Sequence, residues 1–118
     1  NNNVYYYSSS IKTKTEIEPL SEDFYKILKA QPVSFTDKVS GERNIGFIAE
    51  EFDKIGLSNL VIYENGEPVS LSYELVSLYN LEIIKDQQKA IQEQQQQIES
   101  QQKQIDQLKA LVEKLMVK

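Results

Sequence analysis

The sequence contains no cysteine and no histidine. Without cysteine the chain cannot form a disulfide, and without either residue it lacks the side chains that usually bind zinc. Catalysis that depends on histidine is excluded for the same reason. We therefore expect no metal site and no cofactor, and any chemistry must come from other residue types.

Positively charged residues are fewer than negatively charged ones, with 13 Lys and Arg against 18 Asp and Glu and a net charge of −5. Residues 1–71 carry −4 of this charge and residues 72–118 carry −1, so neither part predicts a nucleic-acid partner. No apolar run approaches the ~20 residues of a membrane span, and the start does not have the pattern of a signal peptide. We expect no membrane partner. The chain begins with Asn rather than Met, so we expect it to be an excerpt, or the C-terminal part, of a longer protein.

Proline and glycine are absent after Pro68, so nothing in the sequence breaks one long helix over residues 72–118. Such a helix is roughly 70 Å long at about 1.5 Å per residue. Its apolar residues form a heptad stripe, called the seam below, with β-branched residues at position a and Leu at the last two d positions: Ile84, Ile91, Ile98, Ile105, Leu108, Val112 and Leu115. One helix cannot bury this narrow stripe alone, so we expect partner helices, most simply copies of the same chain.

Glutamine occupies the middle d positions of the seam, at Gln87, Gln94 and Gln101. Amide layers weaken a coiled coil but can hydrogen-bond across its axis and specify register and oligomeric state. We predict a parallel homotrimer in preference to a dimer or an antiparallel pair. The alternative is a solvated, glutamine-rich helix of low complexity, since residues 87–107 contain eleven Gln. The constant phase of the β-branched residues argues against that alternative.

Residues 1–71 predict a small α+β domain of short strands and two short helices. We expect strands at residues 4–7, 33–36, 60–63 and 68–71, with Asn65-Gly66 as the turn of a hairpin, and a strand-like alternation at residues 11–17. Helices are expected from an N-cap at Ser21 through Leu28, and within residues 46–56, where Gly56 is the expected C′ residue. Ser72 should cap the long helix, whose first turns should carry the globular part on Leu75, Val76, Leu78, Tyr79, Leu81 and Ile83. The expected core consists of the periodic apolar residues Phe24, Ile27, Leu28, Phe35, Phe47, Ile48, Phe52, Leu60, Ile62 and Leu71.

Two places could hold chemistry. The first is residues 8–14, where a serine cluster is followed by Lys12 and Lys14. A serine hydroxyl beside a desolvated, neutral lysine can act as nucleophile and general base without histidine, and Lys12 could supply the cation that keeps a second lysine neutral. Spacing alone favours an ordinary solvated loop. The second place is Glu50-Glu51, where consecutive helical residues do not face each other, so a solvated acidic face is preferred to paired carboxylates.

Three motifs, which follow one another along the chain, favour the Ser-Lys chemistry over the solvated loop. Residues 9–20 read SSIKTKTEIEPL, residues 44–51 read NIGFIAEE, and residues 70–81 run into the heptad helix. This set resembles the endosialidase-type intramolecular chaperone domain found at the C-termini of phage tail spikes and fibres, with a related domain in the myelin regulatory factor proteins. The opening pattern of that family is Ser-Asp-x-Arg-x-Lys-x-x-Ile, and its middle pattern is close to Gly-Phe-Ile-Ala-Gln-Glu. The resemblance covers the chain from about Ser9 to its end.

The resemblance implies a chaperone that trimerises the protein upstream of it and then releases itself by autoproteolysis with a Ser-Lys dyad. By position, Ser9 is the nucleophile, Lys14 is the base, and the cleaved bond joins Ser8 to Ser9. Supporting positions are Lys12, Glu50 and Glu51. Ser10 stands where the family usually has Asp, Lys12 where it has Arg, Thr13 where it often has Leu, and Glu50 where it has Gln.

The implied domains are residues 1–8 as the end of the upstream segment, residues 9–71 as chaperone and autoprotease, and residues 72–118 as coiled coil. The implied partners are the chain itself and the upstream part of its own polypeptide. The implied setting is a virion-associated precursor made in the host cytoplasm. A permanent trimerisation module without proteolysis stays open as the alternative.

Overall fold

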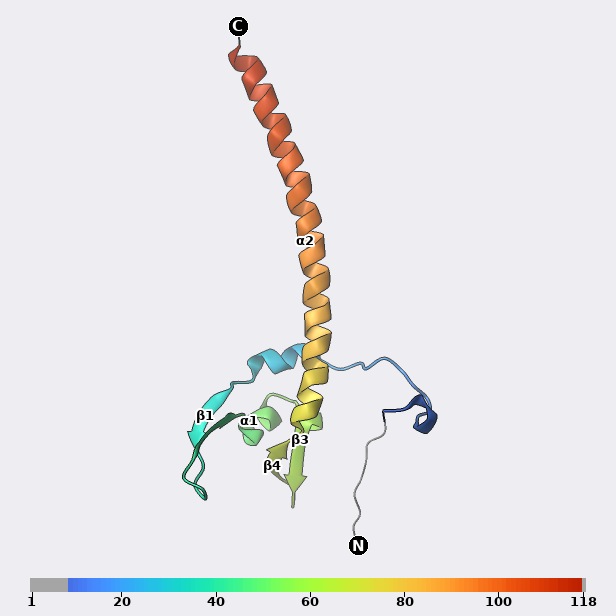
Figure 1. The fold of residues 1–118 in the computed structure, drawn as a ribbon, viewed down its shortest axis with the longest axis vertical. Coiled ribbons are helices and arrows are strands. Elements are labelled where there is room, and N and C mark those ends of the chain that lie inside the picture. Colours follow the sequence, from blue (N-terminus) through green and yellow to red (C-terminus); the bar gives the residue numbers. More distant parts are fainter. Residues whose placement is uncertain (1–8, 118) are drawn as a thin grey trace.

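The computed structural model describes residues 9–117, so the strand expected at residues 4–7 and the residue Ser8 lie outside the described part. The chain forms one long helix with a small α+β unit, called the body below, at the lower end of that helix (Figure 1). The overall extents of the chain are 91 × 43 × 23 Å. The expected α+β class, with short strands and a long C-terminal helix, is confirmed, and the trimeric coiled coil stays a prediction. Within residues 9–117, no helix combines the length and apolar character needed to cross a membrane.

The long helix, α2, runs from Tyr73 to Met116 without interruption, as predicted. Ser72 is its N-cap residue, as predicted, although the Ser72 side chain makes no capping hydrogen bond. Glu74 in the first turn and Lys114 in the last turn have the signs that the helix dipole favours.

Two hairpins form the β part of the body. Strands β1 (Val33–Thr36) and β2 (Arg43–Gly46) pair antiparallel, as do β3 (Val61–Glu64) and β4 (Glu67–Leu71). In the second turn Asn65 and Gly66 both have positive φ, 50° and 77°, as a two-residue type I′ hairpin requires. The Asn65-Gly66 hairpin is confirmed. An isolated two-stranded hairpin is only marginally stable in water, so we expect both hairpins to be stabilised by packing against other elements.

The short helices differ in detail from the predictions. The helix η2 (Phe24–Lys29) is 3₁₀ rather than α and follows Asp23 rather than a Ser21 cap. The helix α1 covers only Ala49–Lys54, because Gly46 belongs to β2. Gly56 lies just past its end with φ 85°, as expected for a C′ residue. Leu60 ends a 3₁₀ turn, η3 (Ser58–Leu60), so the following strand begins one residue later than predicted.

The core lies between α1, β3, β4 and the first turns of α2. Its buried members are Ile27, Ala49, Phe52, Leu57, Leu60, Val61, Leu71, Val76, Tyr79 and Ile83. Phe52 and Leu60 are the largest side chains that are fully enclosed. The predicted core residues Phe24, Phe35 and Phe47 are only half-buried.

Three predicted core residues are exposed instead. In a 3₁₀ helix the side chains at i and i+3 share a face, so Ile27 faces the core while Leu28, 63% exposed, falls on another face. Ile62 follows the buried Val61 along β3 and therefore points to the opposite side of the hairpin. Ile48 precedes α1 as its N-cap residue and is also exposed.

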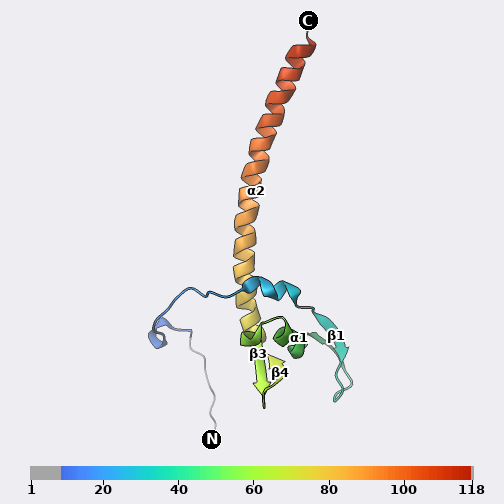
Figure 2. The same ribbon diagram turned by 180° about the vertical axis from the view of Figure 1, so that it is seen from behind.

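The body docks on α2 through one side of its first turns. Val76, Tyr79 and Ile83 are buried there at spacings of three and four residues, whereas the expected contacts Leu75, Leu78 and Leu81 remain exposed. The Phe24 ring meets Tyr79 edge-on with centroids 5.2 Å apart. Farther along, the Tyr25 hydroxyl donates to the Asp86 carboxylate at 3.1 Å. These contacts hold η2 across the helix (Figure 2).

Candidate functional site

The segment that carries the predicted dyad forms a 3₁₀ turn, η1 (Ile11–Thr13), rather than the strand that its alternating pattern indicated. Ser10 caps this turn: its hydroxyl accepts from the Lys12 backbone N–H at 3.1 Å, and the Thr13 hydroxyl donates to the Ser10 carbonyl at 2.9 Å. Short hydroxyl side chains that hydrogen-bond to nearby backbone groups favour turns over extended structure, which explains why this segment forms a 3₁₀ turn and not a strand. Aspartate at position 10 would accept the same N–H as an N-cap.

The turn shortens the path between Ser9 and Lys14. A fully extended stretch would separate their Cα atoms by roughly 17 Å at 3.3–3.4 Å per residue, whereas residues in a 3₁₀ turn advance only about 2.0 Å each. Lys14 follows the turn directly, with its backbone N–H bonded to the Ile11 carbonyl at 3.2 Å. Ser9 and Lys14 are both exposed, and the other side of the predicted cleaved bond, Ser8, lies outside the described residues.

Residues 9–23, called the arm below, are exposed throughout. Figures 1 and 2 show η1 at the far end of the arm, well to the side of α2 and of both hairpins. Glu16 has φ 52°, a left-handed conformation that is uncommon for a residue with a side chain and that bends the arm shortly after Lys14. At its other end the Glu22 carboxylate accepts from the Asn59 amide at 3.2 Å. Within one chain the arm therefore leaves Ser9 and Lys14 in solvent.

Glu50 and Glu51 lie in the first turn of α1, where negative charge complements the helix dipole. Glu50 is exposed and Glu51 half-buried, and both belong to the body, on the other side of α2 from η1 (Figure 1). The structure does not bring these carboxylates to Ser9 or Lys14 within one chain.

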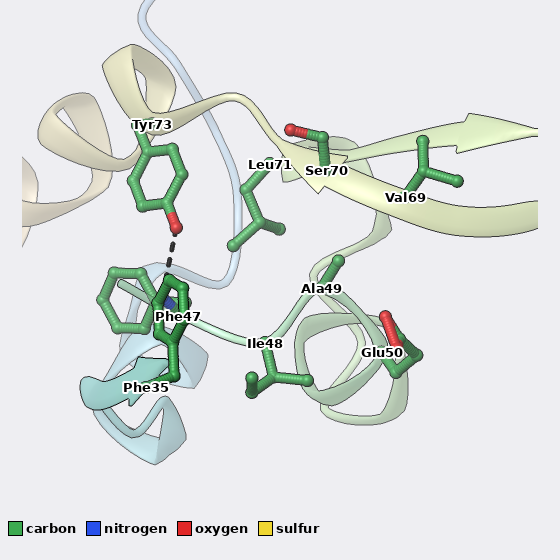
Figure 3. A pocket seen from close by; sticks show the side chains of 9 residues that line it. All are labelled: Phe35, Phe47, Ile48, Ala49, Glu50, Val69, Ser70, Leu71 and Tyr73. Atoms are coloured by element: carbon green, nitrogen blue, oxygen red, sulfur yellow. Dashed lines mark hydrogen bonds between the residues drawn. The ribbon is translucent and has the colours of Figure 1, made fainter. Parts of the chain in front are cut away.

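Beside Glu50 is a shallow hollow that the sequence did not predict (Figure 3). The Phe47 backbone N–H donates to the Tyr73 hydroxyl at 3.1 Å, and the two rings stack with centroids 6.0 Å apart. A Cβ on Gly46 would lie 2.8 Å from the Tyr73 Oη atom, which is too close. The Gly-Phe pair of the middle motif is thus required by packing against the start of α2. No local signal could reveal this contact, because Phe47 and Tyr73 are 26 residues apart.

The seam residues all lie on α2, and their exposed fractions range from 45% at Ile105 to 79% at Leu115. The body covers a different side of the helix, through Val76, Tyr79 and Ile83. No charged residue lies at an a or d position of this stretch. Apart from Lys109 at position e, its charged residues fall at the outer heptad positions b, c and f: Lys85, Asp86, Lys89, Glu93, Glu99, Lys103, Asp106, Glu113 and Lys114. An uncharged, mostly apolar stripe that the chain itself leaves open favours helix–helix association.

Shifted titratable groups occur away from the predicted dyad. The backbone N–H groups of Ser40 and Val39 lower the pKa of Asp37, which accepts from both in the β1–β2 turn. Burial and then the neighbouring Asp86 raise the pKa of Tyr25. A hydrogen bond to Asp53 raises the pKa of Tyr63. The hydrogen bonds of these groups stabilise the β1–β2 turn and contacts between elements of the chain. Among residues 9–117, no cluster of metal-ligating side chains occurs.

The arrangement defines a class of protein: a small α+β body with an exposed N-terminal arm, carried on a long helix whose seam is open to partners. Residues 9–62 match the model of the family described as chaperone of endosialidase, which supports a chaperone domain of endosialidase type in that part of the chain. The name of that family model is that of a peptidase family. Neither the curated proteins nor the solved structures contain a match to this chain.

Proposed function

We propose that the chain is an intramolecular chaperone that trimerises the polypeptide upstream of it and then releases itself by cutting before Ser9. The observation that carries this proposal is the family match, which begins at Ser9 and includes Lys14. The division of the chain follows from it: residues 1–8 end the upstream protein, residues 9–71 form the chaperone and autoprotease, and residues 72–118 form the coiled coil.

The open seam supports the trimer. Seven-residue spacing of Ile84, Ile91 and Ile98 keeps one stripe on one side of α2, and self-association buries it without any other partner. The parallel arrangement places three bodies at one end of the coil. Three upstream chains then start in register, so a slow search among separate chains becomes a local one.

The cleavage chemistry uses Ser9 and Lys14. The Ser9 Oγ atom attacks the Ser8 carbonyl carbon while its proton passes to the neutral Lys14 Nζ atom. The carbon–nitrogen bond between Ser8 and Ser9 then breaks, and the same proton passes to the departing nitrogen, which leaves an ester between the Ser8 carbonyl and Ser9 Oγ. Water hydrolyses this ester, which gives a carboxylate on Ser8 and a free amine on Ser9.

Assembly provides the condition that this chemistry needs. A lysine amine is neutral only when burial or a neighbouring cation disfavours its charged form, and Lys14 is exposed in the single chain. The exposed arm is free to pack against the body of a neighbouring subunit, which would desolvate Lys14 and place Lys12 as the neighbouring cation. Glu50 and Glu51 of such a neighbour are available to orient the arm. Cleavage then reports correct trimer formation.

The test is expression behind the native upstream segment, followed by intact-mass measurement. The wild type should give two fragments, the smaller beginning at Ser9. Ser9→Ala and Lys14→Ala should stop cleavage while sedimentation still shows a trimer, and Lys12→Ala should slow it. A Ser9→Ala protein that is still cut at this bond would disprove the mechanism. A trimeric wild type that stays uncut would favour the second candidate, a permanent trimerisation module, which the open seam alone also supports.

A further inference from the structure

The side-chain amides of the seam glutamines differ in hydrogen bonding from those of neighbouring glutamines on α2. Gln95 Nε2 donates to the Glu99 carboxylate at 3.4 Å, and Gln102 Nε2 donates to the Asp106 carboxylate at 3.0 Å. Across residues 9–117, no side chain or backbone group hydrogen-bonds to the side-chain amides of Gln87, Gln94 and Gln101. Each of these amides lies at a d position between two a-position isoleucines and is exposed in the single chain.

Trimer formation, as proposed above, would bring three copies of each amide to the axis between two layers of isoleucine. Buried amides need hydrogen-bond partners, and each offers one carbonyl oxygen and two N–H donors. Around a three-fold axis, one N–H of each glutamine can bond to the carbonyl of the next. This ring uses every carbonyl once and leaves one N–H per chain. Symmetry places these remaining donors at equal distances from the axis, so donors that turn inward converge on a common point.

The surrounding charges decide what can occupy that point. Between Gln87 and Gln104 the positions that flank the seam, e and g, are occupied only by Gln and Ala, and the carboxylates of Glu93 and Glu99 are at outer positions. A cation would find no carboxylate at the axis, and one of the two lone pairs of each carbonyl oxygen is already used in the ring. A small anion would accept three N–H bonds, which are stronger when the acceptor is charged.

We infer that the trimer axis is a binding site for monovalent anions, with chloride as the physiological ligand, at the Gln87, Gln94 and Gln101 layers. This inference rests on the proposed trimer. Because the site is complete only in the trimer, the anion stabilises that state by mass action and makes assembly sensitive to halide concentration.

The first arm of the test compares thermal unfolding in sodium chloride and sodium fluoride at equal ionic strength and fixed protein concentration. Fluoride is the reference because it holds its hydration shell most strongly. The melting temperature of the wild type should be several degrees higher in chloride. The variant with Gln87→Ile, Gln94→Ile and Gln101→Ile should lose this difference, since isoleucine at both a and d retains the preference for more than two strands.

Two single variants give a matched control. Gln94→Ile should lose roughly a third of the chloride effect if the layers act independently. Gln96→Ile makes the same change two residues later, at the outer position f, and should leave the whole effect in place. Crystals soaked in bromide should show anomalous peaks on the three-fold axis at the glutamine layers.

The failures are distinguishable. Sedimentation of the wild type, measured first, overturns the trimer and this inference together if it shows a monomer or a dimer. A trimer whose chloride effect is equal in the wild type and in the triple isoleucine variant overturns the anion site alone. Dependence on sodium against potassium rather than on the halide overturns it too, because the ligand would then be a cation.

Discussion

The Tyr73 hydroxyl accepts a hydrogen bond from the Phe47 backbone N–H at 3.1 Å, and the same oxygen lies 2.8 Å from the place where a Cβ of residue 46 would be. One atom of the first turn of α2 thus holds the Gly-Phe motif from two directions. Tyr73→Phe should lower the free energy of unfolding by about 1 kcal/mol, the usual net value of one hydrogen bond.

A double-mutant cycle separates the two roles of this oxygen. Gly46→Ala should destabilise the wild type, because the new methyl group collides with the hydroxyl. In the Tyr73→Phe background the next nearest atom, Phe35 Cε1, is 3.5 Å away, an ordinary contact, so the same change should cost less. Urea unfolding of the four proteins at one protein concentration measures the coupling. Equal costs in both backgrounds would show that the hydroxyl does not restrict residue 46.

Burial predicts which aromatic residue supports the body most. Phe52 is 0% exposed, whereas Phe47 is only half-buried. Phe52→Ala should lower the free energy of unfolding by about 3–5 kcal/mol, and Phe47→Ala by less. Leu28→Ala, at a position that is 63% exposed within one chain, is the control and should change the free energy of unfolding little. Chemical denaturation checks the order, and a Phe47 variant weaker than the Phe52 variant would contradict it.

The seam prediction is tested in the middle of the coil. Ile98→Asp would place three like charges around one axis, so the trimer should dissociate. The matched control is Gln96→Asp, which adds the same charge at an outer position and should leave the trimer intact. Sedimentation equilibrium at micromolar concentrations distinguishes the two variants. Retention of the trimer by Ile98→Asp would place the association surface elsewhere on the chain.

Ser10, the N-cap residue of η1, should affect the rate of the proposed cleavage before Ser9. Ser10 Oγ accepts from the Lys12 backbone N–H at 3.1 Å, a contact that an aspartate could also make. In the protein with its upstream segment, Ser10→Ala should slow cleavage because the turn loosens, while Ser10→Asp should keep it. Timed mass spectrometry gives the rates. A Ser10→Ala rate equal to that of the wild type would show that the cap does not position Ser9 and Lys14.

Asp37 should make the tip of the first hairpin sensitive to acid. Its folded pKa lies below the ordinary value of about 3.9 because Ser40 and Val39 donate to its carboxylate. The stabilisation is therefore present above that ordinary value and is lost as the pH falls through the folded pKa. The amide protons of Val39 and Ser40 should shift with a midpoint below pH 3.9 in NMR spectra. Asp37→Asn should remove this titration, and a midpoint at or above the ordinary value would contradict the contact.

The sequence by itself determined the elements whose signals are local. The uninterrupted helix of Tyr73–Met116 follows from the absence of Pro and Gly, and the Asn65-Gly66 hairpin follows from the positive φ that its turn requires. The ordered motifs were enough to indicate the chaperone family, which the match of residues 9–62 bears out. Each of these signals lies within a short stretch of chain, so no knowledge of distant contacts was needed.

Only the tertiary structure decided which apolar residues are enclosed and how the arm lies. Leu28 and Ile62 fit the apolar patterns of their segments, yet η2 and β3 turn them away from a body too small to cover both faces of each element. The turn at Ile11–Thr13 formed because Ser10 and Thr13 bond to nearby backbone groups, against the alternation that indicated a strand. The Phe47–Tyr73 contact joins residues 26 apart, and such a pairing is set by packing, which no local pattern encodes.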